Sequence, residues 1–152
     1  MEQGPSSLLY THIITSIMGE AFAIIAFVFA VSYLMQQKAL KTKQYKRLSL
    51  AQMPISKLQT ALVMTLWAGF ILMTSGLIMG AVYAQFYIVG NRSELLGKII
   101  WAFLVWAWYL ATLVSKNLAN IGSRKLAWMT IFGFGLLAVG MFGINDWSYL
   151  LG

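Results

Sequence analysis

Four long apolar runs, separated by short polar segments, make up most of this 152-residue chain. They cover about residues 11–35, 58–85, 98–114 and 125–144. A helix of about 20 apolar residues crosses the hydrocarbon core of a bilayer, and each run is near or above that length. None of the runs alternates polar and apolar residues as a membrane β-strand does. The pattern predicts an all-α integral membrane protein, a bundle of four transmembrane helices in one domain over residues 1–152.

Composition points to the same class. Hydrophobic residues make up 60% of the chain and charged residues only 10%, whereas a soluble domain carries about 25% charged residues. The lipid bilayer is therefore the expected partner of the outer surface. The chain has no cysteine and one histidine, which excludes disulfides and a structural zinc site. No catalytic motif is visible, so we expect a protein that is not an enzyme.

The charges outside the apolar runs are sorted by sign. Nine of the eleven cations lie in the connections after the first and third runs, at Lys38, Lys41, Lys43, Lys46, Arg47, Lys57, Lys116, Arg124 and Lys125. The three acids outside the runs lie on the other side, at Glu2, Glu94 and Asp146. Because basic connections stay in the cytoplasm, we expect the N-terminus and the C-terminus outside, in a bacterial-type inner (cytoplasmic) membrane or its equivalent. The net charge of +7 is then a topology signal, and we expect no nucleic-acid partner.

The basic cytoplasmic connection, residues 36–57, has two interpretations. Its spaced apolar residues fit a short helix lying on the inner leaflet, with Pro54 marking the break before the second run. A solvated basic linker fits equally well.

Two polar residues stand in the first run, where a membrane helix normally avoids them. His12 is the single histidine and Glu20 is one of four acids; with Ser16 between them at spacings of four, they share one helix face. A neutral imidazole can ligate haem iron or another metal, or it can simply hydrogen-bond to headgroups, water or backbone. A carboxyl group inside a span usually faces protein or a water-filled cavity. Glu20 is therefore a proton-relay or cofactor-supporting group, or a hydrogen-bonding group between helices.

Small and aromatic residues mark the second and third runs. Gly76 and Gly80 form a G-x-x-x-G pair, which indicates close helix packing. Trp101 fits an interfacial aromatic belt. Trp106 and Trp108 lie deeper, where they either pack in the bundle or flank a flat cofactor or a partner helix.

The order of these features resembles a known family. The chain reads H-I-I-T-S-I-M-G at 12–19, G-F-I-L-M-T-S-G-L-I-M-G-A at 69–81, G-K-I-I-W-A-F-L-V-W at 97–106, S-R-K-L-A-W-M-T-I at 123–131 and F-G-I-N at 142–145. Over about residues 8–145 it is similar to the C-terminal half of the cytochrome c assembly membrane proteins, which include the system II haem-transporting synthase component and a related protein associated with haem biosynthesis. In that family, two outer histidines bracket a tryptophan-rich segment at which haem is presented. The resemblance implies that His12 is the first outer histidine and that Trp101 is the tryptophan after the segment.

The chain departs from the family pattern at several positions. Residues 87–98 read YIVGNRSELLGK where the tryptophan-rich segment is expected. Ala111 and Thr112 stand where a further histidine is expected, and no histidine follows Asn145. Glu20 takes the place of a usual tyrosine. One chain therefore offers one haem ligand, the second must come from a partner chain or another copy, and catalysed haem attachment is not expected here.

We therefore expect a non-catalytic, haem-handling protein of the cytochrome c assembly type that is a subunit of a larger membrane complex. The candidate cofactor-binding residues are His12, Glu20 and Trp101, and His12 is the candidate metal ligand. Haem is the expected cofactor, and other membrane subunits or a second copy are the expected protein partners. Two alternatives stay open: a cofactor-free accessory subunit of a respiratory or photosynthetic membrane complex, and a small proton-coupled transporter that uses Glu20.

Overall fold

A computed structural model of the chain describes residues 4–42, 53–87 and 92–150, with side chains over 7–42, 53–84 and 97–142. It contains four helices, α1 Gly4–Thr42, α2 Ile55–Tyr87, α3 Arg92–Leu118 and α4 Ser123–Leu150. Each contains a stretch long and apolar enough to cross a membrane, and the described residues contain no strand. The predicted fold class, an all-α membrane protein with four spanning helices, is confirmed.

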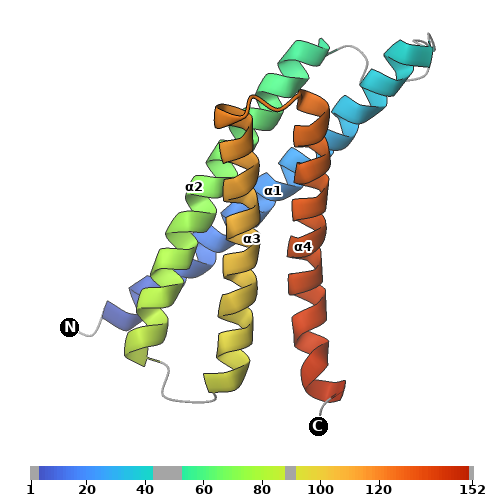
Figure 1. Ribbon diagram of the computed structural model, residues 1–152. Coiled ribbons are helices and arrows are strands. Elements are labelled where there is room, and N and C mark those ends of the chain that lie inside the picture. Colours follow the sequence, from blue (N-terminus) through green and yellow to red (C-terminus); the bar gives the residue numbers. More distant parts are fainter. Residues whose placement is uncertain (1–3, 43–52, 88–91, 151–152) are drawn as a thin grey trace.

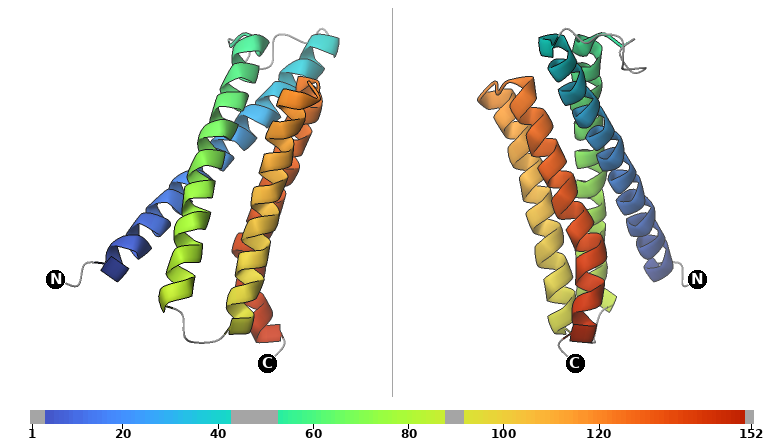
Figure 2. Two further views of the ribbon diagram at one scale, coloured as in Figure 1. Left: turned by 60° about the vertical axis from the view of Figure 1, so that its left-hand side comes forward. Right: turned by 90° about the vertical axis from the view of Figure 1, so that its right-hand side faces the viewer.

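The helices run up and down in turn, so that both termini lie at one end of the bundle, which we call the terminal end (Figure 1). α3 and α4 lie side by side over their whole length, whereas α1 crosses the bundle obliquely (Figures 1 and 2). At the terminal end the start of α1 stands away from the end of α4 (Figure 2). The start of α1 therefore lies apart from the α3–α4 pair at the terminal end (Figure 2).

The first helix is longer than the apolar run from which it was predicted. It continues to Thr42 because the residues after Met35 are mainly glutamine, lysine, alanine and leucine, which are good helix formers. The predicted interfacial helix falls largely on residues 43–52, outside the described residues. α2 begins directly after Pro54, whose carbonyl accepts the Leu58 N–H at 3.1 Å, and proline is well suited to a helix start.

A short turn joins α3 to α4. Asn120 has a φ of 44°, and asparagine is one of the few residues that adopt this left-handed conformation readily. Beside it, the N–H groups of Ala119 and Ile121 both donate to the Ser115 carbonyl, at 3.2 and 3.4 Å. These bonds satisfy the end of α3 and return the chain at once into α4.

The exterior of the bundle is as apolar as its interior. Ile17, Ile71, Phe103 and Val139 are all more than half exposed, as expected for side chains that face lipid. The core is formed by alanines, branched aliphatic residues and two tyrosines from all four helices: Ala23, Ala26, Ala30, Tyr33, Leu58, Leu62, Leu66, Val105, Tyr109, Leu113, Leu126, Ala127 and Leu137. Because lipid is as apolar as this core, helix association depends on close packing and hydrogen bonds between helices.

Glycines bring α1 and α2 into close contact. A Cβ atom added to Gly19 of α1 would lie 2.9 Å from Cγ of Met73, and one added to Gly69 of α2 would lie 3.2 Å from Cβ of Phe22. Each distance is shorter than an ordinary van der Waals contact. The absence of a side chain at these positions allows the two backbones to approach.

Indole rings seated on glycines join α3 to α4. Trp108 lies over Gly133, where an added Cβ would be 2.9 Å from the ring carbon Cδ1. Trp101 lies over Gly140 in the same way, and there an added Cβ would overlap the ring. Both indole N–H groups donate to backbone carbonyls of α4, at 3.1 Å for Trp101 and 2.9 Å for Trp108. Packing and hydrogen bonding thus coincide along this helix pair.

Aromatic contacts connect these two helix pairs to each other. The Trp106 indole N–H donates to Oγ1 of Thr74 at 3.0 Å, and the Trp106 ring stacks on Phe70 with centroids 5.8 Å apart. On the other side, Phe27 of α1 stacks on Phe134 of α4 at 4.5 Å. The deeper tryptophans that the sequence left open are therefore engaged in packing within the bundle.

Candidate functional site

His12 lies in the first turns of α1, at the terminal end, and packs against α2. Its Nδ1–H donates to the backbone carbonyl of Gly76 at 2.8 Å; the direction is fixed because a carbonyl oxygen can only accept. In a neutral ring, Nε2 then keeps its lone pair. This is the arrangement typical of metal-binding histidines, in which the second ring nitrogen bonds to a carbonyl or carboxylate.

The G-x-x-x-G pair provides the surface on which this ring rests. An added Cβ at Gly80 would lie 2.7 Å from Cε1 and 3.0 Å from Nδ1 of His12. An added Cβ at Gly76 would instead meet the next turn of α1, at 2.8 Å from Oγ of Ser16. The motif therefore does more than bring two helices together, because it also accommodates the imidazole.

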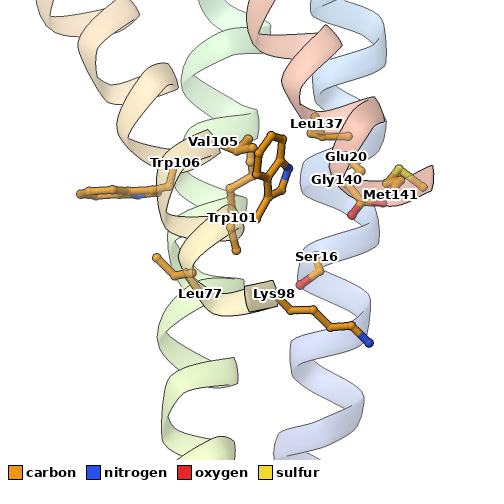
Figure 3. A pocket seen from close by; sticks show the side chains of 12 residues that line it. Ser16, Glu20, Leu77, Lys98, Trp101, Val105, Trp106, Leu137, Gly140 and Met141 are labelled. Atoms are coloured by element: carbon orange, nitrogen blue, oxygen red, sulfur yellow. The ribbon is translucent and has the colours of Figure 1, made fainter. Parts of the chain in front are cut away.

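A cavity of about 400 Å³ opens between the four helices near the terminal end. Its polar groups are Ser16 and Glu20 of α1 and Lys98 of α3. Figure 3 shows Lys98 extending along the edge of the cavity below Ser16, with Glu20 deeper in the bundle. The remaining wall is mostly apolar and is formed by Met73, Leu77, Trp101, Ala102, Val105, Trp106, Leu137, Gly140 and Met141. A largely apolar cavity with a few polar groups is typical of sites that bind small molecules.

Trp101 forms one wall of this cavity and is fixed in place. Its ring stands between α3 and α4 (Figure 3), and its N–H is taken by the Leu136 carbonyl. The indole nitrogen is thus already used within the bundle, and the ring offers a ligand mainly apolar surface.

The structure brings two of the three candidate residues together. Glu20 and Trp101 line the same cavity, whereas His12 is not among the residues that line it. Ser16 connects the two places, because it lines the cavity and also contacts the glycine pair beside His12. The polar face of α1 predicted from the spacing of four is therefore divided: the part nearer the terminal end packs on α2, and the deeper part faces the cavity.

Among the described residues, His12 has no nearby set of classical metal ligands. Within the described part of the chain, no three histidine, cysteine, aspartate or glutamate residues gather closely enough to hold a metal ion. A lone imidazole would instead suit a metal that is already held by a macrocycle, as in haem.

Sequence reasoning missed Tyr109 and the partner of His12. Tyr109 is a core residue that is 2% exposed, and its hydroxyl has no hydrogen-bond partner among the described residues. No pattern along the chain signals such a group, because its surroundings come from three other helices. The G-x-x-x-G pair was a visible signal for the His12 site, but it does not say which residue of the facing helix rests on it.

Comparison with known proteins assigns a family. The family model described as "Cytochrome C assembly protein" matches residues 2–151. Proteins named cytochrome c biogenesis protein CcsA are similar to this chain: those of Nandina domestica, Helianthus annuus and Amborella trichopoda are 37%, 36% and 33% identical over 90 residues. Each match covers 53% of this chain and 28% of the relative. No solved structure matches the chain.

Proposed function

Because the chain belongs to the cytochrome c assembly protein family, we propose that it handles haem during the assembly of c-type cytochromes, as a non-catalytic subunit of a larger membrane complex. The observation that carries the proposal is the state of His12. Its Nδ1–H is bonded to a backbone carbonyl at 2.8 Å, and Nε2 remains as a donor for iron. The residues present would thus provide one imidazole ligand to a haem iron.

A second histidine ligand would come from another chain. The sequence contains one histidine, so a bis-histidine site requires His12 from a second copy or a ligand from a different subunit. These two arrangements differ in stoichiometry, with one haem per two chains in the first and one per chain in the second. When bound, haem supplies the metal and the macrocycle, and this chain supplies an oriented imidazole.

Glu20 and Trp101 have a supporting role in this proposal. They face one largely apolar cavity that His12 does not line. They would therefore contact the periphery of a bound molecule, Trp101 through its apolar ring and Glu20 through its carboxyl group, and would not ligate its metal. Substitution of either residue should therefore weaken retention of the cofactor but leave unchanged the absorption features that arise from ligation by His12.

The test is purification of the intact complex in mild detergent, followed by an absorption spectrum and a haem assay. His12→Ala should abolish the Soret band, whereas Thr11→Ala should keep it, because the exposed Thr11 hydroxyl donates within its own helix, to the Ser7 carbonyl. A Soret band unchanged in His12→Ala would overturn the ligand assignment. A complex that is intact but free of haem would overturn the proposal and favour the cofactor-free accessory subunit.

The proposal also places the terminal end on the outer face of a bacterial-type inner membrane or its equivalent. This rests on the basic residues Lys38 and Lys41 near the end of α1. The chain has no cysteine, so single-cysteine variants report one position each. In intact cells or spheroplasts, a maleimide that cannot cross membranes should label Ser7→Cys and not Lys41→Cys. The opposite labelling would reverse the orientation.

A further inference from the structure

We infer that Gly76 and Gly80 of α2 are positioning residues for His12, which hold its ring so that Nδ1 carries the proton and Nε2 keeps the lone pair that would bind a ligand. Only the part of this inference that concerns haem rests on the proposed function. The part that concerns the ring itself stands on the geometry of α1 and α2 alone.

The contact between His12 and Gly76 determines which ring nitrogen carries the proton. The Gly76 carbonyl lies 2.8 Å from Nδ1 of His12 and can only accept a hydrogen bond, so the proton of a neutral ring must be on Nδ1. The partner of one ring nitrogen decides which nitrogen can bind a metal. A backbone carbonyl is a durable choice of partner, because no side-chain substitution removes it.

The His12 ring leaves no room for a side chain at Gly80. The ring lies so close to Gly80 that a methyl group there would be 2.7 Å from Cε1 and 3.0 Å from Nδ1. Real Cβ atoms essentially never approach other heavy atoms below 3.0 Å, so alanine at this position must displace the ring or the helix. A shift of the ring would disturb its bond to Gly76, which is the contact that sets the tautomer.

Two other glycines distinguish an effect on the imidazole from an effect on helix packing. Gly69 also lies in the contact between α1 and α2, and a Cβ there would be 3.2 Å from Cβ of Phe22. Gly69→Ala therefore disturbs the helix pair and not the imidazole. Among the described residues, no atom beyond the chain neighbours and helix backbone of Gly135 in α4 would lie within 4 Å of a Cβ added there, so Gly135→Ala is a control for the substitution itself.

The first experiment needs no haem. His12 is the single histidine, so labelling with ¹⁵N-histidine gives the ring nitrogens of one residue in NMR spectra of the haem-free protein. We expect the Nδ1–H tautomer in the wild type, in Gly69→Ala and in Gly135→Ala, and a mixture of tautomers in Gly80→Ala. An Nε2–H tautomer in the wild type would overturn the inference, and this result does not depend on whether Gly80→Ala folds.

The second experiment measures haem affinity of the same variants in the intact complex. Loss of the group that orients a histidine ligand typically weakens metal binding about 10- to 100-fold, so we expect a decrease of that size for Gly80→Ala and wild-type affinity for Gly135→Ala. If the wild type binds haem through His12 and Gly80→Ala binds it equally well, the positioning role is overturned. If the wild type shows the Nδ1–H tautomer but binds no haem, the proposed function fails and the positioning of the ring stands.

Discussion

Tyr109→Phe should make the protein more stable. The Tyr109 side chain is 2% exposed, and its hydroxyl has no hydrogen-bond partner among the described residues. The narrow gap beside it, lined by Ala23, Ala26 and Thr65, has no room for a water molecule. A buried polar group without a partner costs about 1–3 kcal/mol. Because phenylalanine keeps the ring and removes the hydroxyl, we expect the free energy of unfolding to rise by about 1 kcal/mol, the lower end of that range.

The measurement is reversible unfolding in mixed micelles, followed by tryptophan fluorescence. Tyr109→Ala is the matched variant: it removes the ring as well and should lower the free energy of unfolding by about 3 kcal/mol, as for other large aromatic truncations in cores. A Tyr109→Phe protein that is less stable than the wild type by about 1 kcal/mol or more would refute the reasoning, because such a loss is the cost of removing a hydrogen bond that is made.

Two further predictions concern the contacts between helices. A double-mutant cycle with Trp106→Phe and Thr74→Val should give a coupling free energy of about 0.6 kcal/mol, the average for hydrogen bonds between membrane helices; zero coupling would mean that the 3.0 Å bond contributes nothing to stability. Gly133→Ala places a methyl group 2.9 Å from the Trp108 ring and should lower the free energy of unfolding by about 1–3 kcal/mol through overpacking. Gly135→Ala, with open space around it, should leave stability unchanged or raise it, and equal losses in both variants would contradict this explanation.

The number and class of the helices could be predicted because they depend on run length and on the absence of charge, both of which are local. The end of α1 at Thr42 was harder, because lysines beyond a span mark a connection by their charge while still favouring helix by their propensity. Similarly, Gly76 and Gly80 predicted close packing, but spacing along one helix cannot say that an imidazole from another helix rests on it.

The candidate site could likewise be predicted only in part from the sequence. The spacing of His12, Ser16 and Glu20 placed them on one face of a helix, and the structure has Ser16 and Glu20 on the cavity wall. Whether His12 also faces that cavity depends on the crossing of α1 over α2, which is a property of two helices together. The family resemblance, carried by residues spread over nearly the whole chain, is confirmed by the match over residues 2–151, and the roles of His12, Glu20 and Trp101 stay predictions.

The seating of two indoles on two glycines gives the α3–α4 hairpin a defined register. Trp101 and Trp108 are seven residues apart, as are Gly133 and Gly140, and the antiparallel pairing matches Trp101 to Gly140 and Trp108 to Gly133. Seven residues are nearly two turns, or about 10 Å of helix, so both contacts lie on one face and favour the left-handed crossing of about 20° seen in heptad-repeat packing. A shift of the α3–α4 pairing by one residue would move both rings off their glycines at once, which leaves no intermediate alignment of the two helices. The short connection between the helices therefore need not specify the alignment, and a chain divided there should recover it when the two halves are produced together.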